Sequence, residues 1–157
     1  MTTIHRLSND QDATLFDEYS KVELIDGIVY DKMNVGDAPM RAVNRPNQLL
    51  SPLWGSYVIS VQSPIKWEDN EPEPDVAIYR PCQRQTPEHC VLVIEVADST
   101  LHHDRTVKVP AYLSQGLTAW IVNLPENKIE IDPPGEPRRE VSKAEILGVE
   151  IDVEDLA

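Results

Sequence analysis

The sequence feature that most constrains the fold is an apolar run, VLVIEVA at residues 91–97, with a single carboxylate inside it. The run is rich in β-branched residues, which favour strands, and its nearly continuous apolar character predicts a strand buried at the centre of a sheet. A buried charge is costly unless it is paired or binds a metal. We therefore expect Glu95, the one charged residue of this run, to face a functional site.

Two further runs of the same kind precede this one. SYVISVQ at 56–62 and DVAIYR at 75–80 are also predicted strands, and the second of them is expected beside 91–97 at the sheet centre. The segment between them, KWEDNEPEPD, contains Pro72 and Pro74, which hold the preceding residues in extended geometry. It is therefore predicted to be a stiff loop that delivers Asp75 to the start of a strand.

The remaining pattern predicts an α/β fold of mixed α+β type, in which helices flank a central mixed sheet. Asp26-Gly27 is typical of the tight turn of a hairpin, because both residues tolerate a positive φ angle. Pro46 is expected to kink or shorten a helix that spans 37–53. The other predicted elements are a helix at 12–21, a helix at 99–115 that ends at Gly116, strands at 119–124 and 128–132, and a turn-rich acidic tail at 133–157.

Composition limits the partners and indicates the compartment. The length of 157 residues predicts a single domain over 1–157, and 27 Asp and Glu against 14 Lys and Arg give a formal net charge of −13. Such a charge repels polyanions, so nucleic-acid binding would require bound cations or a locally positive groove. No apolar run approaches the roughly 18 residues of a membrane span, and only two cysteines occur, which favours a reducing cytoplasm. The basic residues expected to form a groove are Arg41, Arg45, Lys66, Arg80 and Arg105.

Three charged residues on separate predicted elements can form one site. Asp75 and Glu95 lie on neighbouring strands, so their carboxylates can share a divalent cation such as Mg²⁺ or Mn²⁺. In the following helix, Asp104, Lys108 and Tyr112 are spaced i, i+4, i+8 and share one face, from which Lys108 can reach the carboxylates and the other two can support it. The metal would polarise a phosphodiester and ionise a water, while Lys108 would orient that water or stabilise the developing charge.

Glu23, in the segment VELI beside the Asp-Gly turn, is a further candidate carboxylate, because its strand neighbours are apolar. Each candidate also has a plain structural interpretation. Glu95 can be edge-exposed or salt-bridged, and Asp75 stands at a loop-to-strand junction, where Asp is common. Lys108 and Asp104 can form a surface ion pair. The three residues in this order favour the functional interpretation.

Six blocks of the chain keep the order and spacing of a known family: VELIDG, VQSPI, EPEPDVAIYR, LVIEVADST, DRTVKVPAY and AWIVNL. They resemble the Uma family of restriction endonuclease-like proteins, which belongs to the PD-(D/E)xK nuclease superfamily. The resemblance extends from Val22 to Asp132. It implies a restriction-endonuclease-like core with an N-terminal helix and β-hairpin, and metal-dependent hydrolysis of DNA.

In that superfamily, a Pro-Asp on one strand and an acidic residue two positions before a lysine on the next strand bind the metal and activate water. By resemblance, Pro74-Asp75 supplies the first part and Glu95 the second. Ala97 occupies the expected lysine position. The resemblance implies that the lysine has migrated to the following helix, where it corresponds to Lys108.

Two other positions follow the family and one departs from it. Glu23 matches an acidic residue near the first hairpin, and Gln62 matches the glutamine of the VQ block as a supporting residue. Family members carry a histidine in a Ser-Pro-x-x-His segment that opens the second helix. Here the stretch reads VGDAPMRAVNRP, and Met40 stands at that position, with Pro46 further along the helix.

Two functions of different classes follow. The first is a Mg²⁺-dependent endonuclease acting on DNA, with Asp75 and Glu95 holding the metal, Lys108 acting on the attacking water and Glu23 assisting. The second is a catalytically inactive relative that keeps the nuclease fold as an interaction or assembly module, which Met40, Pro46 and the net charge favour. A glycosidase would need a sugar cleft with carboxyls about 5 to 9 Å apart. By analogy with small nucleases of the superfamily, we expect a homodimer, because cutting two strands takes two active sites.

Overall fold

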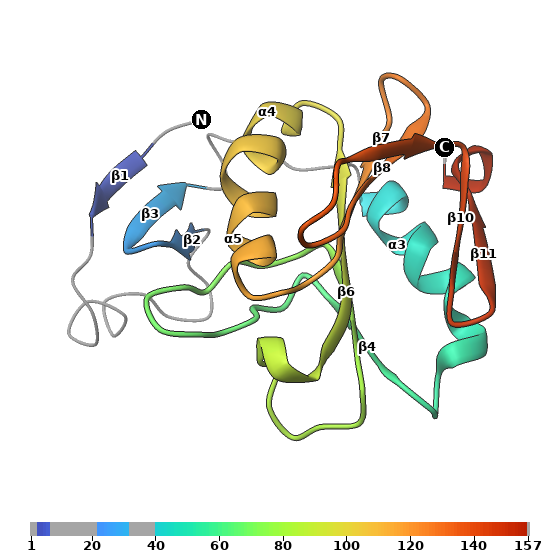
Figure 1. The fold of residues 1–157 in the computed structure, drawn as a ribbon, viewed down its shortest axis with the longest axis horizontal. Coiled ribbons are helices and arrows are strands. Elements are labelled where there is room, and N and C mark those ends of the chain that lie inside the picture. Colours follow the sequence, from blue (N-terminus) through green and yellow to red (C-terminus); the bar gives the residue numbers. More distant parts are fainter. Residues whose placement is uncertain (1–2, 7–21, 32–39, 157) are drawn as a thin grey trace.

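The fold is built on a six-stranded mixed sheet, and the computed structural model describes residues 3–6, 22–31 and 40–156 (Figure 1). The predicted helix at 12–21 lies outside these residues. The strand order in the sheet is β4-β5-β6-β7-β8-β9. These strands are β4 (Val58–Val61), β5 (Val76–Tyr79), β6 (Cys90–Ala97), β7 (Ala119–Asn123), β8 (Lys128–Asp132) and β9 (Arg139–Val141). The mixed α+β fold predicted from the sequence is thereby confirmed.

The register of the central strands brings the predicted carboxylates together. Val76 of β5 pairs with Ile94 of β6 in an antiparallel register. Asp75 and Glu95 therefore lie opposite each other, one residue further along the two strands. Only β6 and β7 run parallel within this sheet, and a helical crossover connects them. Parallel neighbours require such a crossover, and it places the helix over the face of the sheet that carries Glu95.

The N-terminal part forms a small separate sheet, ordered β1-β3-β2. Its strands are β1 (Thr3–Arg6), β2 (Val22–Ile25) and β3 (Ile28–Asp31). Asp26 and Gly27 connect β2 to β3 with φ angles of 52° and 74°, which confirms the predicted hairpin turn. Backbone hydrogen bonds between Leu24 and Glu71 join this hairpin to the loop that precedes β5.

The helix α3 (Met40–Leu49) runs through Pro46 and is followed by a 3-10 helix, Ser51–Leu53. The helix thus continues through Pro46, and it ends at Leu49, before the expected end at residue 53. The amide of Leu50 donates to the Pro46 carbonyl at 3.0 Å, and Val43 and Leu50 are buried on one side of this segment. Packing of this apolar face offsets the hydrogen bond that the proline lacks.

The crossover contains α4 (Leu101–His103), a π-helical turn (Asp104–Lys108) and α5 (Val109–Ser114). The predicted helix is thus present and ends as expected before Gly116, which has a φ of 74°. The π-helical turn was not predicted from the sequence. Figure 1 shows this crossover on one side of the sheet and α3 on the other.

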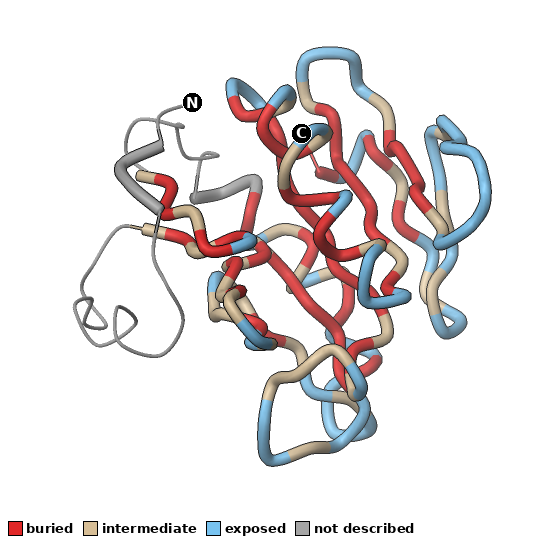
Figure 2. Tube along the Cα trace, turned by 60° about the vertical axis from the view of Figure 1, so that its left-hand side comes forward, coloured by how far each residue is buried: buried red, intermediate tan, exposed pale blue. Residues whose placement is uncertain are grey.

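The C-terminal residues, expected as a turn-rich acidic tail, contain β9, β10 (Lys143–Ile146), β11 (Val149–Asp152) and a 3-10 helix, Val153–Leu156. Ile151, Val153 and Leu156 are buried in the core on the α3 side of the sheet. The central strands are buried along most of their length, whereas most residues of β10 and β11 are exposed or partly buried (Figure 2). Within the described ranges, no helix has the length and apolar character needed to cross a bilayer.

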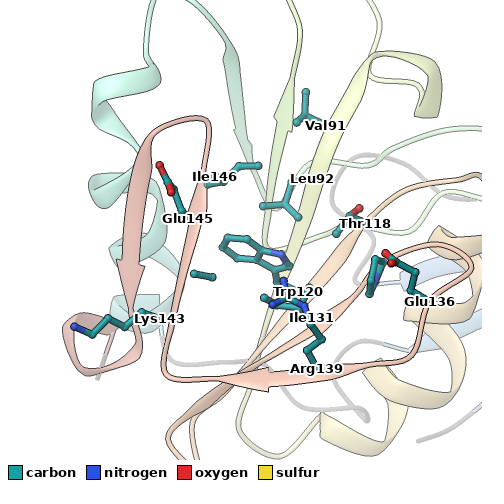
Figure 3. A pocket seen from close by; sticks show the side chains of 12 residues that line it. Val91, Leu92, Thr118, Trp120, Ile131, Glu136, Arg139, Lys143, Glu145 and Ile146 are labelled. Atoms are coloured by element: carbon teal, nitrogen blue, oxygen red, sulfur yellow. The ribbon is translucent and has the colours of Figure 1, made fainter.

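A cavity of about 490 Å³ lies on the α3 side of the sheet (Figure 3). Leu92, Trp120 and Ile131 line its apolar part, and Arg139 and Lys143 are among its charged lining residues. The buried side chains of Leu92 and Trp120 belong to the core that contains α3, whereas Glu95 faces the crossover. This cavity therefore lies on the opposite face of the sheet from the predicted carboxylates.

Candidate active site

Glu95 is the centre of a buried polar cluster between β6 and the crossover helix. Its side chain faces the helix, and the residue is 1% exposed. The Tyr112 hydroxyl donates to Glu95 Oε2 at 2.7 Å, and Lys108 Nζ lies 2.8 Å from the same oxygen. Glu95 is therefore a buried, paired carboxylate and not an exposed edge residue.

Lys108 also joins the N-terminal hairpin to the central sheet. Its Nζ lies 2.6 Å from Glu23 Oε1 and donates to the Glu73 carbonyl oxygen at 3.1 Å. The Glu73 amide in turn donates to Glu23 Oε1 at 2.7 Å. The sequence did not reveal the role of Glu73, because a backbone carbonyl carries no residue-type signal. Lys108, Glu23 and Glu95 are thus brought together from a helix and two separate sheets.

Asp75 and Glu95 hold each other in place through the backbone. The amide of Val96 donates to Asp75 Oδ2 at 2.8 Å, and the amide of Asp75 donates to Glu95 Oε1 at 3.3 Å. Asp75 is half-buried, in contrast to Glu95. The rigid segment that ends at Pro74 and the first pair of the β5–β6 ladder therefore fix two carboxylates side by side, one of them accessible to solvent.

The π-helical turn determines how the crossover presents its charged residues. It spans Asp104–Lys108, and π-helical turns are frequent at functional sites. The Thr100 hydroxyl donates to Asp104 Oδ2 at 2.9 Å, and both residues are buried. Asp104 and Lys108 are both buried, on the side of the crossover that faces the sheet. The surface ion pair considered from their spacing alone is therefore wrong. Thr100 occupies the N-cap position of α4, and its hydroxyl bonds to the Asp104 side chain and not to the backbone.

The remaining predicted positions lie at the margin of the cluster. Gln62 follows β4 with a φ of 51°, and its backbone amide donates to the Asp75 backbone carbonyl oxygen at 3.0 Å. The Gln62 residue is exposed. Met40 opens α3, and its side chain lies outside the described part of the structure.

Burial and like charges shift the protonation of the cluster. Burial, opposed by Lys108 and reinforced by neighbouring carboxylates such as Asp75, raises the pKa of Glu95 well above its ordinary value. Burial likewise raises the pKa of Asp104 to about 7, although Lys108 and the Thr100 hydroxyl oppose it. Burial lowers the pKa of Lys108, but the charges of Glu23 and Glu95 outweigh it and keep the ammonium protonated. Among the described residues, four carboxyl groups therefore interact with one ammonium: Glu23, Asp75, Glu95 and Asp104 with Lys108.

A buried histidine adjoins the same cluster. His103 packs against Tyr30 with ring centroids 5.1 Å apart, and His102, its neighbour in the chain, is exposed. Burial and the positive charge of Lys108 lower the pKa of His103 to about 4. The imidazole is therefore neutral near pH 7 and adds no positive charge against the carboxylates.

The cluster fits a divalent metal in the kind and charge of its ligands. Within the described ranges, no three His, Cys, Asp or Glu side chains converge as a complete metal site. Mg²⁺ does not require one, because it is commonly held by one or two carboxylates and completed by waters and substrate phosphates. Asp75 and Glu95 are oxygen donors of this type, and the excess of carboxyl groups around them is the charge that a divalent cation neutralises.

Two of the basic residues expected near the cluster lie elsewhere. Arg45 donates to the Asp155 carbonyl at 3.0 Å, which places it against the C-terminal segment. Arg105 hydrogen-bonds to Glu130 of β8. Lys66 and Arg80 also have partners within the protein. Lys66 Nζ lies 3.8 Å from Glu71 Oε1, and the Arg80 guanidinium donates to the Glu88 carbonyl oxygen. These contacts within the protein leave the candidate site without the predicted contribution of Arg45 and Arg105.

A family model, Uma2, described as "Putative restriction endonuclease", matches residues 8–156. The chain belongs to the Uma2 family. This confirms the family resemblance found in the sequence blocks.

A solved structure has the same fold as this Uma2 protein. It is the crystal structure of a "putative nuclease belonging to DUF820" from Anabaena variabilis ATCC 29413. The TM-score is 0.70 at 13% sequence identity, over 94% of this chain and 95% of that chain. At this identity the likeness shows the fold alone. No curated protein matches the chain.

Proposed function

We propose that this Uma2 protein is a metal-dependent endonuclease that hydrolyses phosphodiester bonds of DNA. The observation that carries the proposal is the buried contact of Lys108 with Glu95 and Glu23, directly beside the half-buried Asp75. Membership in a family described as restriction endonucleases supports the same reaction class. The four residues belong to separate segments of the chain, and the fold brings them together in one cluster.

Asp75 and Glu95 would hold the divalent cation, Mg²⁺ or Mn²⁺. When bound, such an ion polarises the phosphate and lowers the pKa of a coordinated water. Asp75 is the accessible carboxylate of the pair, so the phosphate would approach from its side of the cluster. Glu95 is held from behind by the Tyr112 hydroxyl, which fixes its orientation without adding charge.

Lys108 would take the role of the lysine that the superfamily carries on the strand. Glu23, the Glu73 carbonyl and Glu95 surround its ammonium, and these contacts keep it protonated and oriented. A protonated, fixed ammonium stabilises negative charge that develops on the phosphate, or orients the attacking water. Glu23 acts on Lys108 and not on the substrate, so it is a positioning residue.

The test is cleavage of supercoiled plasmid DNA with Mg²⁺ or Mn²⁺, comparing the parent with Asp75→Asn. We expect cleavage to fall by about 100-fold or more, since the charge stabilisation that a metal supplies amounts to several kcal/mol. Glu145→Gln is the matched control, because Glu145 is an exposed carboxylate at the cavity on the opposite face of the sheet. Undiminished cutting by Asp75→Asn, at matched folding, would exclude this site.

One observation favours the second function, an inactive interaction or assembly module. Lys108 contacts both Glu95 and Glu23 at salt-bridge distance, and a closed set of ion pairs can serve the fold alone. This interpretation predicts that the parent neither cuts DNA nor binds Mn²⁺ in the presence of DNA.

Homodimer formation, which double-strand cleavage requires, is also part of the first proposal.

A further inference from the structure

The strand β4 lies at one edge of the central sheet. It pairs with β5 on one side, and within the described ranges no strand pairs with its other side. Sheet edges in monomeric proteins are commonly blocked by a charged side chain, a proline or a bulge. The sequence of β4 is VISV, and its register with β5 is regular. The edge thus carries none of these protective features.

The segment around β4 is also uncharged. Residues 46–65 contain no Asp, Glu, Lys, Arg or His, although the whole chain carries a net charge of −13. Two copies of so acidic a protein repel each other over most of their surfaces. This segment is a region where two copies can approach without bringing like charges together.

A large aromatic side chain is presented beside the edge. Trp54 is 55% exposed, and Val58 at the start of β4 is 36% exposed. The turn that carries Trp54 is well fixed, because the amides of Ser56 and Tyr57 both donate to the carbonyl of buried Leu53. The backbone that carries the exposed indole is therefore held in place by the fold.

A shallow hollow of about 280 Å³ adjoins the indole. Polar and apolar groups both contribute to its surface, which is lined by Asn47, Trp54, Gly55, Tyr57 and Ile59. A two-fold axis places the exposed indole and the hollow of one copy against the hollow and the indole of the other, so the patch is self-complementary in shape.

We propose that the β4 strip, defined as residues 54–61, is the interface of a symmetric dimer of this chain. The β4 strands of two copies pair antiparallel, which joins the two six-stranded sheets, and each Trp54 is buried against the strip of the other copy. A second copy is the partner because the strip is self-complementary and has no charge with which to recognise a charged partner.

This interface has a consequence for the proposed nuclease activity. Gln62 directly follows β4, and its amide donates to the Asp75 carbonyl. The dimer would therefore hold two candidate sites in one particle, each next to the shared edge. Only this consequence rests on the proposed function, since dimerisation itself requires no catalysis.

The experiment measures the molar mass by sedimentation equilibrium, from low to high micromolar concentration. The parent is expected to dimerise, and Trp54→Glu and Val58→Lys are each expected to weaken the dimer by about tenfold or more. Leu147→Glu is the control, because Leu147 is also an exposed hydrophobic residue, at 41%, but lies in the β10–β11 turn. Thermal unfolding of each variant tests whether the fold is retained.

A parent that stays monomeric at every concentration would overturn the inference, and so would a dimer that neither strip variant weakens. If both variants unfold, amide hydrogen exchange in the parent decides: protection of Ile59 and Val61 that rises with concentration supports the interface, and constant protection contradicts it. Nicking of one DNA strand by the monomeric variants separates this test from that of the active site. Retained nicking with loss of dimerisation would leave the proposed function intact.

Discussion

Two buried charge clusters on the same face of the sheet differ in how their charges are balanced. The Glu95 cluster consists of Glu23, Asp75, Glu95, Asp104, Lys108 and Tyr112. The Glu130 cluster lies on β8, two strands away, where Arg105 Nε donates to Glu130 Oε1 at 2.8 Å and Arg138 lies 3.0 Å from the same oxygen. Asn123 Nδ2 donates to the other Glu130 oxygen at 2.8 Å. One crossover helix therefore supplies a cation to each cluster.

The pKa shifts of the two central carboxylates run in opposite directions. Burial raises the pKa of Glu95, and its carboxylate neighbours add to the shift. Burial also acts to raise the pKa of Glu130, but hydrogen bonds from Arg105 and Asn123 outweigh it and hold the pKa below its ordinary value. The Glu130 cluster is thus satisfied by the protein itself. The Glu95 cluster retains an excess of carboxyl groups, which is the property expected of a cation-binding site.

Removal of Lys108 should give the largest loss of stability. Lys108→Met leaves Glu23 and Glu95 buried without their shared ammonium, and breaking a buried ion pair in this way costs about 3–5 kcal/mol. The loss should be smaller at pH 5 than at pH 8, because Glu95 and Asp104 have raised pKa values and take up protons. Urea unfolding at the two pH values measures both effects.

Arg105→Met is the control for that prediction in the Glu130 cluster. Arg138 and Asn123 still bind Glu130 in this variant, so a smaller loss is expected. Equal losses in the two variants would contradict the difference drawn between the clusters.

Glu130→Gln should destabilise the protein by about 2 kcal/mol at pH 7, because it removes the charge that two guanidinium groups share. Since the pKa of Glu130 is lower in the folded protein than its ordinary value of 4.5, this contribution is present above that pH and is lost as the pH falls further. Chemical denaturation from pH 3 to pH 8 tests this. Glu95→Gln is expected to lower the free energy of unfolding at pH 7 by less than Glu130→Gln does, because it also removes the repulsion between Glu95 and the neighbouring carboxylates.

Asp104→Asn should change the pH dependence of stability. An unfolded Asp ionises near pH 3.8 and the folded Asp104 near pH 7, so the folded state binds more protons between these values and stability falls as the pH rises. The variant removes this loss, and a gain of about 1 kcal/mol or more at pH 8 is expected. Unfolding at pH 5 and pH 8 measures it. A pH profile identical to that of the parent would contradict the assignment.

Tyr112→Phe should have the smallest effect, about 1 kcal/mol, because it removes one hydrogen bond while Glu95 keeps its contact with Lys108. The loss should grow with pH, since the hydroxyl favours the ionised carboxylate. Comparing thermal unfolding of the variant with that of the parent across the neutral range shows whether this is so. A gain in stability at high pH would be the contrary result.

Local sequence patterns predicted most of the central sheet. The strands predicted at 75–80, 91–97, 119–124 and 128–132 became β5, β6, β7 and β8 within about one residue of their expected ends. The first three are nearly continuous apolar runs, and the fourth alternates charged residues with isoleucine. The strands β10 and β11 were missed, since their exposed faces are charged and only a few residues, such as Ile151, reach the core. The π-helical turn was missed because its hydrogen-bond pattern has no residue-type signature.

Sequence patterns likewise predicted part of the candidate site. Glu95 and Glu23 could be found because each is a charge among apolar strand neighbours. Glu130 carries the same signal, a charge between Ile129 and Ile131, but it was missed, and its partners Arg105 and Arg138 meet it only after folding. Likewise, the Glu73 carbonyl became visible as a partner of Lys108 only in three dimensions.

The most direct test of this account is the calorimetric titration of Mn²⁺ into the parent, Glu95→Gln and Glu130→Gln, with and without a DNA duplex. We predict that the parent and Glu130→Gln bind the cation, and that Glu95→Gln binds at least about tenfold more weakly, because it loses a charged oxygen ligand. Equal binding by all three proteins, or no binding by the parent even with DNA, would contradict the claim that the Glu95 cluster is a cation-binding site.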